Sequence, residues 1–124
     1  MTLRSAHADF AWVVVGTNAA VGAWALAAHQ WERFRSRALW WSTIVAEVCV
    51  LAQVGMGVAL VAIQHHKVAG FHALYGFSAF ATVGIVYSYR QQMPGRQYLL
   101  YGLGGLFLMG LALRAIQVSP FPPH

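Results

Sequence analysis

Four long apolar runs, separated by short polar joints, make up most of this chain. They cover residues 10–29, 39–63, 70–89 and 98–116. Each run holds about 20 residues or more, and an α-helix of that length crosses a hydrocarbon core about 30 Å thick. Backbone groups in lipid are satisfied only in helices or closed barrels, and these runs lack the alternating pattern of barrel strands. The pattern therefore predicts an all-α integral membrane protein, a bundle of four transmembrane helices.

The joints between the runs are too short to hold a second folded unit, at about six to nine residues each. We therefore expect one transmembrane domain over residues 1–124. The tail at residues 119–124 is rich in proline and should be extended, because proline cannot continue a helix. The first apolar run is longer than the roughly 7–15 residues of a signal-peptide core, so we expect it to be a retained helix.

Composition supports a membrane location. Hydrophobic residues make up 59% of the chain and charged residues 9%, against roughly 25% charged residues in soluble domains. The net charge is +5, but the basic residues lie at the ends of the apolar runs, where they act as topology signals and headgroup anchors. We also find no nucleotide-binding motif. The expected partners are the lipid bilayer and other membrane protein subunits, with no nucleic acid and no nucleotide.

The basic residues are divided unequally between the joints. Most lie in the first and third joints: Arg33, Arg35, Arg37, Arg90 and Arg96. The N-terminus, the second joint and the last helix end carry the others: Arg4, Lys67 and Arg114. Positive residues are enriched on the cytoplasmic side of membranes. We therefore expect a multi-pass protein of the bacterial cytoplasmic (inner) membrane, with both termini outside.

Three polar side chains lie within the apolar runs: Asn18, Glu47 and Gln53. A carboxylate in lipid is costly to ionise, so Glu47 should be protonated, hydrogen-bonded or turned toward a polar cavity. Its candidate partners at similar depth are Asn18, Trp24, Thr82 and Tyr101. Glu47 could serve a proton relay, a quinone contact or cation coupling, or it could only hold helices together. The amides of Asn18 and Gln53 are expected to bridge helices or subunits.

Several histidines gather at the predicted outer boundary, close to an arginine: His65, His66, His72 and Arg114. Bis-imidazole haem b in a four-helix bundle needs two histidines at one depth on neighbouring helices. His72 with His65 or His66 meets that condition, and Arg114 could bind a haem propionate. A second hypothesis is a copper or zinc site formed by His65, His66 and His72. Alternatively, these histidines only contact headgroups or a partner protein.

An aromatic stretch at residues 71–77, which includes Tyr75, could line a quinone pocket, although aromatic residues at helical spacing also serve packing. Glycines recur on the last three helices and should allow close helix approach, which drives association in lipid. They are Gly55, Gly57, Gly76, Gly84, Gly102, Gly104, Gly105 and Gly110.

Motifs along most of the chain resemble those of a group of small four-helix membrane proteins of high-GC bacteria. They are Asn18…Gly22-Ala23-Trp24, Trp40-Trp41, Gln53…Gly57, Phe71-His72-Ala73-Leu74-Tyr75-Gly76-Phe77, Tyr87-Ser88-Tyr89-Arg90 and Gly110…Arg114-Ala115. This resemblance implies a location and a topology, and no activity. His72 and its neighbours are also similar to four-helix haem b membrane proteins, which implies a haem b cofactor.

Taken together, these features favour a small accessory or structural subunit of a larger membrane complex, respiratory or otherwise energy-converting. The chain has little mass outside its apolar runs and no arrangement of nucleophile and base suited to covalent chemistry. We therefore expect no catalytic activity from the chain by itself. The first alternative is an electron-transfer subunit that binds haem b or quinone. The second is a small proton-coupled transporter that uses Glu47.

Overall fold

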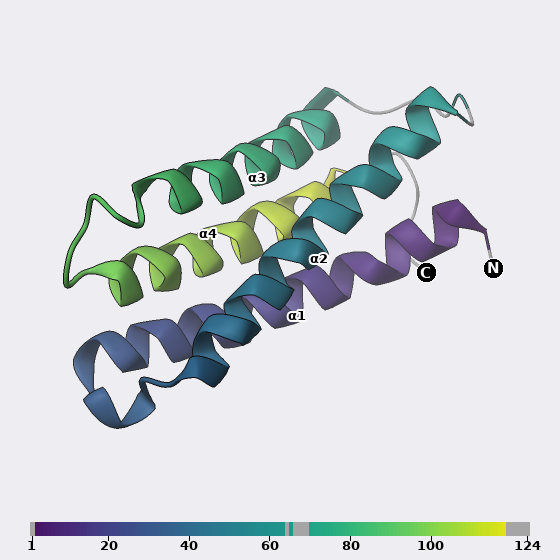
Figure 1. Cartoon of the computed structure of the whole chain (residues 1–124). Helices are drawn as coiled ribbons and strands as arrows, with labels where there is room; N and C mark the ends of the chain where they lie inside the picture. The colour runs from purple at the N-terminus through teal and green to yellow at the C-terminus, as the bar shows by residue number, and fades with distance from the viewer. Residues whose placement is uncertain (1, 64, 66–69, 119–124) are drawn as a thin grey trace.

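The computed structural model describes residues 2–63, 65 and 70–118, and this part of the chain is all-helical. Its long helices are α1 (Leu3–Gln30), α2 (Arg37–Ala62), α3 (Gly70–Tyr89) and α4 (Gln97–Gln117), with a short 3-10 helix, η1 (Glu32–Phe34), after α1 (Figure 1). All four long helices are long and apolar enough to span a membrane. The predicted all-α four-helix bundle is confirmed, and the chain has the character of a multi-pass membrane protein. Sidedness and the kind of membrane stay predictions.

Helix α1 begins earlier than the apolar pattern predicts, at Leu3 instead of Phe10. The cause is a capping box, in which the Thr2 hydroxyl accepts the Ser5 N–H at 3.1 Å and the Ser5 hydroxyl accepts the Thr2 N–H at 3.3 Å. Such reciprocal bonds satisfy backbone donors that an uncapped helix start leaves unpaired. The polar segment before the first apolar run is therefore helical, and it includes His7.

The joint between α1 and α2 is held by side chains that satisfy backbone carbonyls. The Trp24 indole N–H donates to the Phe34 carbonyl at 2.8 Å, and Arg35 Nε donates to the Ala28 carbonyl at 2.7 Å. The Arg35 guanidinium also lies over the Tyr98 ring of α4, at 4.9 Å from its centroid. The Arg35 bond occupies a carbonyl at the end of α1 that has no partner within the helix, and the Trp24 bond ties η1 back to α1.

The helices α1 and α4 form the closest pair in the bundle. A Cβ atom on Gly22 would lie 2.9 Å from the Leu106 nitrogen, and one on Gly105 would lie 2.9 Å from the Gly22 Cα. Glycine is required at both positions because the two backbones touch there. Helix α1 also packs against α2, and α3 packs against α4, whereas α2 and α3 contact each other little. The bundle is therefore open along its α2–α3 side.

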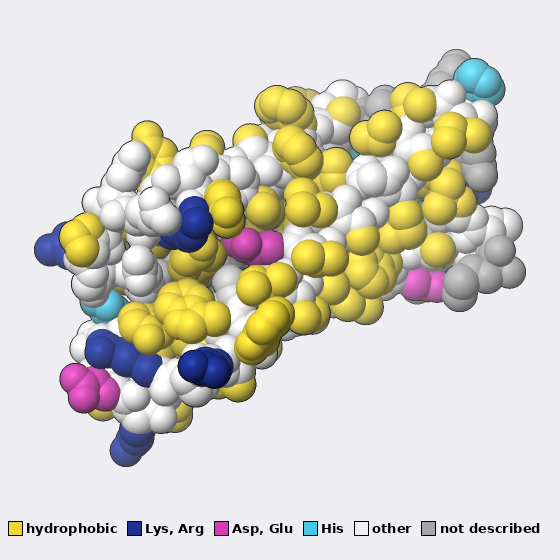
Figure 2. Space-filling view, in the orientation of Figure 1, with side chains coloured by type: hydrophobic (Ala, Val, Ile, Leu, Met, Phe, Trp, Pro, Cys, Tyr) yellow, Lys and Arg dark blue, Asp and Glu magenta, His cyan; other side chains and the backbone are white. Residues whose placement is uncertain are grey.

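A central apolar cluster takes one buried residue from each long helix: Val14, Val50, Val83 and Leu108. Near it, the buried Asn18 amide donates to the Val14 carbonyl at 2.9 Å and to the Ala46 carbonyl of α2 at 3.4 Å. Asn18 thus bridges two helices, as expected for an amide inside the bundle. Figure 2 shows hydrophobic side chains along the length of the visible face and most of the visible basic side chains at one end.

Candidate functional site

Two histidines meet at the end of the bundle where α1 and α3 begin and α2 and α4 end, which we call the histidine end. His7 of α1 and His72 of α3 have ring centroids 6.1 Å apart, and their planes make an angle of 79°. Both side chains are partly buried. Two imidazoles from different helices therefore lie at one depth beside each other.

A hydrogen bond to α4 fixes the proton position on His72. Its Nδ1 lies 2.8 Å from the carbonyl oxygen of Ala115. A carbonyl oxygen only accepts, so the proton of this bond belongs to Nδ1, and the neutral ring keeps its lone pair on Nε2. An Nδ1–H bonded to a backbone carbonyl is the usual way in which proteins orient a metal-binding histidine. This hydrogen bond leaves Nε2 of His72 as the ring nitrogen with a free lone pair.

His7 lies in a tight site built by α2. The Gln53 amide nitrogen donates to the His7 backbone carbonyl at 2.7 Å, and a Cβ atom on Gly57 would lie 3.2 Å from Cε1 of the His7 ring. The buried atoms His7 Nδ1 and Gln53 Oε1 have no hydrogen-bond partner within the described part of the chain. Unpaired buried polar atoms are rare and cost free energy. A water molecule or a ligand at this site would satisfy them.

Arg114 and Tyr75 lie next to the histidine pair. The Arg114 guanidinium is 6.0 Å from the centroid of the Tyr75 ring, and its Nη1 donates to Gln117 Oε1 at 2.9 Å. Arg114 is exposed and directly precedes Ala115, the residue that binds His72. A fixed, accessible positive charge therefore lies beside the imidazoles, where an anionic group could bind.

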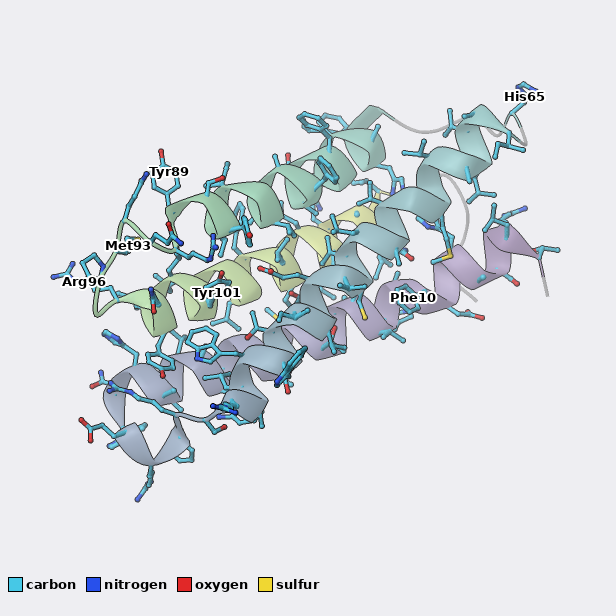
Figure 3. The ribbon with its side chains drawn as sticks, in the orientation of Figure 1. Phe10, His65, Tyr89, Met93, Arg96 and Tyr101 are labelled. Atoms are coloured by element: carbon cyan, nitrogen blue, oxygen red, sulfur yellow. The ribbon has the colours of Figure 1, made fainter. Side chains whose placement is uncertain are left out.

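The other histidines predicted for this site lie elsewhere. His65 is exposed and has a positive φ of 56°, and Figure 3 shows it at the tip of α2, pointing away from the bundle. His66 lies outside the described residues, as do Lys67 and the tail at residues 119–124. The structure thus brings His72 together with His7, which the sequence analysis missed. The Thr2–Ser5 capping box was the signal that could have placed His7 on a helix.

Glu47 lies nearer the opposite end, which holds the first and third joints and which we call the arginine end. It lines a groove of about 750 Å³ between α2 and α3. Behind it is a void of about 10 Å³, lined among others by Asn18, Thr43 and Tyr101. Of the partners expected for Glu47, Asn18 and Tyr101 surround this void.

The remaining expected partners of Glu47 bond elsewhere. The Trp24 indole donates to Phe34, and the Thr82 hydroxyl donates to the Ser78 carbonyl at 2.7 Å within α3. The aromatic stretch predicted as a quinone pocket is largely turned outward, since Phe71 and Phe77 are 67% and 69% exposed. No residue of that stretch lines the groove beside Glu47.

Comparison of the chain with known protein families, with curated proteins and with solved structures gives no match. The geometry of its side chains is therefore the basis for assigning a function.

Proposed function

We propose that this protein is a membrane haem b subunit that carries electrons, in which His7 and His72 would hold the haem iron. The observation that carries this proposal is the pairing of the two imidazoles across the bundle, with His72 oriented by the Ala115 carbonyl. The pair joins the second turn of α1 to the first turn of α3. Histidines on two helices of a four-helix bundle are a recurrent means of holding haem.

The separation of the rings agrees with ligation of one iron. A metal–imidazole bond is about 2 Å long and the ring adds roughly 1 Å, so two imidazoles on opposite sides of one metal have centres about 6 Å apart. The centroids of His7 and His72 are 6.1 Å apart. Their angle of 79° corresponds to ligand planes that are nearly perpendicular to each other.

The donor set favours haem over a bare metal ion. Within the described residues there is no group of three or more His, Cys, Asp or Glu side chains that could hold a metal ion. Haem iron needs only two protein ligands, because the porphyrin supplies four nitrogens. Gly76, one turn beyond His72 on the same face, has open space where a side chain would begin. Arg114 supplies a charge that can pair with a propionate.

A purely structural role is the competing explanation. In that case His72 only satisfies a carbonyl in the last turn of α4, and His7 only packs against Gly57. The two explanations differ in what they require of His7, because the structural role needs no lone pair directed at a common centre. The experiment therefore has to measure haem binding and helix content separately.

The test is expression in a host that makes haem b, followed by mild-detergent purification and a reduced-minus-oxidised absorption spectrum. Wild-type protein should show a b-type spectrum, and His7→Leu and His72→Leu should each abolish it while far-UV circular dichroism shows unchanged helicity. His65→Ala and His66→Ala are the matched controls and should keep the haem. Wild-type protein that stays colourless even after haem is added would contradict the proposal. Loss of haem in His65→Ala with retention in His7→Leu would assign a different pair.

We also propose that the protein works as a subunit of a larger membrane complex, respiratory or otherwise energy-converting. The described connections between helices are short, with only η1 and its flanks after α1 and residues 90–96 between α3 and α4. They offer little surface for a soluble electron donor, so the donor and acceptor should be membrane partners. The chain should co-purify with larger proteins in a fixed ratio after mild extraction. Migration as a free monomer in native gels would contradict this role.

A further inference from the structure

The groove between α2 and α3 has the size and composition of a small-molecule site. Its volume of about 750 Å³ lies within the roughly 300–1,000 Å³ of typical ligand pockets. Its walls are mainly apolar and open to the side, since Val48 of α2 and Phe80 of α3 are 55% and 51% exposed. In a bilayer this opening would face the lipid. A ligand could therefore enter from the membrane without crossing water.

Polar groups line the groove from the arginine end as far as Glu47. Arg90, Gln91 and Gln97 lie at the arginine end, and Glu47 and Tyr101 lie further along. Figure 2 shows an acidic side chain at mid-length, among hydrophobic ones, on the visible face. The groove thus combines a polar head region with apolar walls that continue about one helical turn past Glu47 to Leu51 and open to the side, which matches an amphipathic molecule with a flat head and a hydrocarbon tail.

Glu47 is the feature that a ligand would explain. Within the described part of the chain no hydrogen bond or ion pair engages its carboxyl group, although that group lies between apolar helices. A polar group in such surroundings costs free energy until it is paired. Glu47, Thr43 and Tyr101 also line the void of about 10 Å³ behind the groove, which is close to the space that one water molecule needs. The carboxyl group can therefore contact a ligand on one side and a water molecule on the other.

We propose that this groove binds a lipid-soluble quinone, with the headgroup against Glu47 and Tyr101 and the isoprenoid tail along the apolar wall. A quinone carbonyl accepts a hydrogen bond and a quinol hydroxyl donates one. A carboxyl group can serve both forms, because it donates when protonated and accepts when ionised. A phospholipid does not fit as well, since its phosphate would be held by Arg90 at the arginine end of the groove and would leave the Glu47 carboxyl group unpaired. A helix of another protein would leave the same carboxyl group unpaired unless it brought a polar partner.

Photoaffinity labelling locates the ligand directly. The protein is placed in phosphatidylcholine vesicles and exposed to an azidoquinone with a ten-carbon tail, and labelled peptides are identified by mass spectrometry. We expect labels on the groove-facing parts of α2 and α3, with unlabelled quinone competing and phosphatidylglycerol failing to compete. Labels spread over all outward faces without competition would overturn the proposal. Equal competition by phosphatidylglycerol would overturn it in favour of a lipid site.

Two neighbouring valines on α2 supply a matched control. Val48 and Val45 are 55% and 56% exposed, but only Val48 lines the groove. Val48→Trp should fill the groove and reduce the affinity for quinone by at least about tenfold, as should Glu47→Leu through the loss of a hydrogen bond. Val45→Trp should leave the affinity for quinone within about twofold of the wild-type value. If Val48→Trp and Val45→Trp lowered the affinity for quinone equally, the quinone would not bind in this groove.

The groove beside Glu47 does not contain the histidine pair, so quinone binding can be tested independently of haem binding. The labelling is repeated on His7→Leu protein, which lacks one proposed iron ligand. Unchanged labelling of the groove in that variant is the expected result. Labelling that vanishes together with the haem would overturn the assignment to Glu47 and place the quinone at the histidine end.

Discussion

The contact between α1 and α4 makes a quantitative prediction, because it rests on glycines at which the two backbones touch. We consider Gly22→Ala. The added Cβ would lie 2.9 Å from the Leu106 nitrogen and 3.1 Å from the Gly102 oxygen, whereas ordinary contact begins at 3.4 Å. Both neighbours are backbone atoms and cannot rotate away, so the helices must separate by about half an ångström. Forcing such overpacking costs about 1–3 kcal/mol of unfolding free energy.

The matched control is Gly16→Ala on the same helix, where an added Cβ meets nothing within 4 Å. Both substitutions gain helix propensity, by about 1 kcal/mol each, and this gain cancels in their comparison. Gly22→Ala should therefore be less stable than Gly16→Ala by about 1–3 kcal/mol. On α4 the same comparison pairs Gly105→Ala, which meets the Gly22 backbone at 2.9 Å, with Gly110→Ala, which lies in open space.

The assay is reversible unfolding in mixed micelles, in which sodium dodecyl sulfate is titrated into a mild detergent and helix loss is followed by circular dichroism. The midpoint and slope give the unfolding free energy of each variant. Equal stabilities of Gly22→Ala and Gly16→Ala, within about 0.5 kcal/mol, would mean that the helices do not touch at Gly22. The close packing of α1 against the first half of α4 would then be wrong.

Two further predictions use neighbouring residues as controls. The Trp40 ring stacks on Tyr98 of α4 at 5.0 Å and meets Tyr101 edge-to-face at 5.4 Å, whereas Trp41 is 67% exposed. Trp40→Ala should therefore lower the unfolding free energy by about 3 kcal/mol and Trp41→Ala by less than about 1 kcal/mol, in the same micelle assay. Gly57→Ala should press on the His7 ring and lower the haem content of purified protein, and Gly55→Ala, which meets nothing, should not. Equal haem in the two glycine variants would place the iron away from His7.

The helices were largely predictable because apolar length alone identifies a membrane span. The third run has the bounds of α3, and the second and fourth runs agree with α2 and α4 within two residues at each end. Helix α1 was predicted too short, because its first turns carry Arg4, His7 and Asp9 and no apolar signal marks them. Only the capping box around Thr2 indicates where that helix begins.

The candidate site was harder to predict, because pairing between helices depends on how they cross. The sequence placed His72 and Arg114 at one edge, and the structure places them there together. It did not identify His7, since sequence proximity favoured His65 or His66 as the partner of His72. His7 lies beside His72 because the capping box extends α1 back to Leu3, and no apolar pattern marks that extension.

The most direct test of haem binding by His7 and His72 identifies the side chains that bind the iron. Near-infrared magnetic circular dichroism of the oxidised, haem-loaded protein distinguishes a histidine pair from a histidine–methionine pair. Wild-type protein should show two histidine ligands, and His7→Met should change to histidine–methionine ligation with a raised reduction potential, while His65→Met stays unchanged. A histidine pair that persists in His7→Met and is lost in His65→Met would contradict the account.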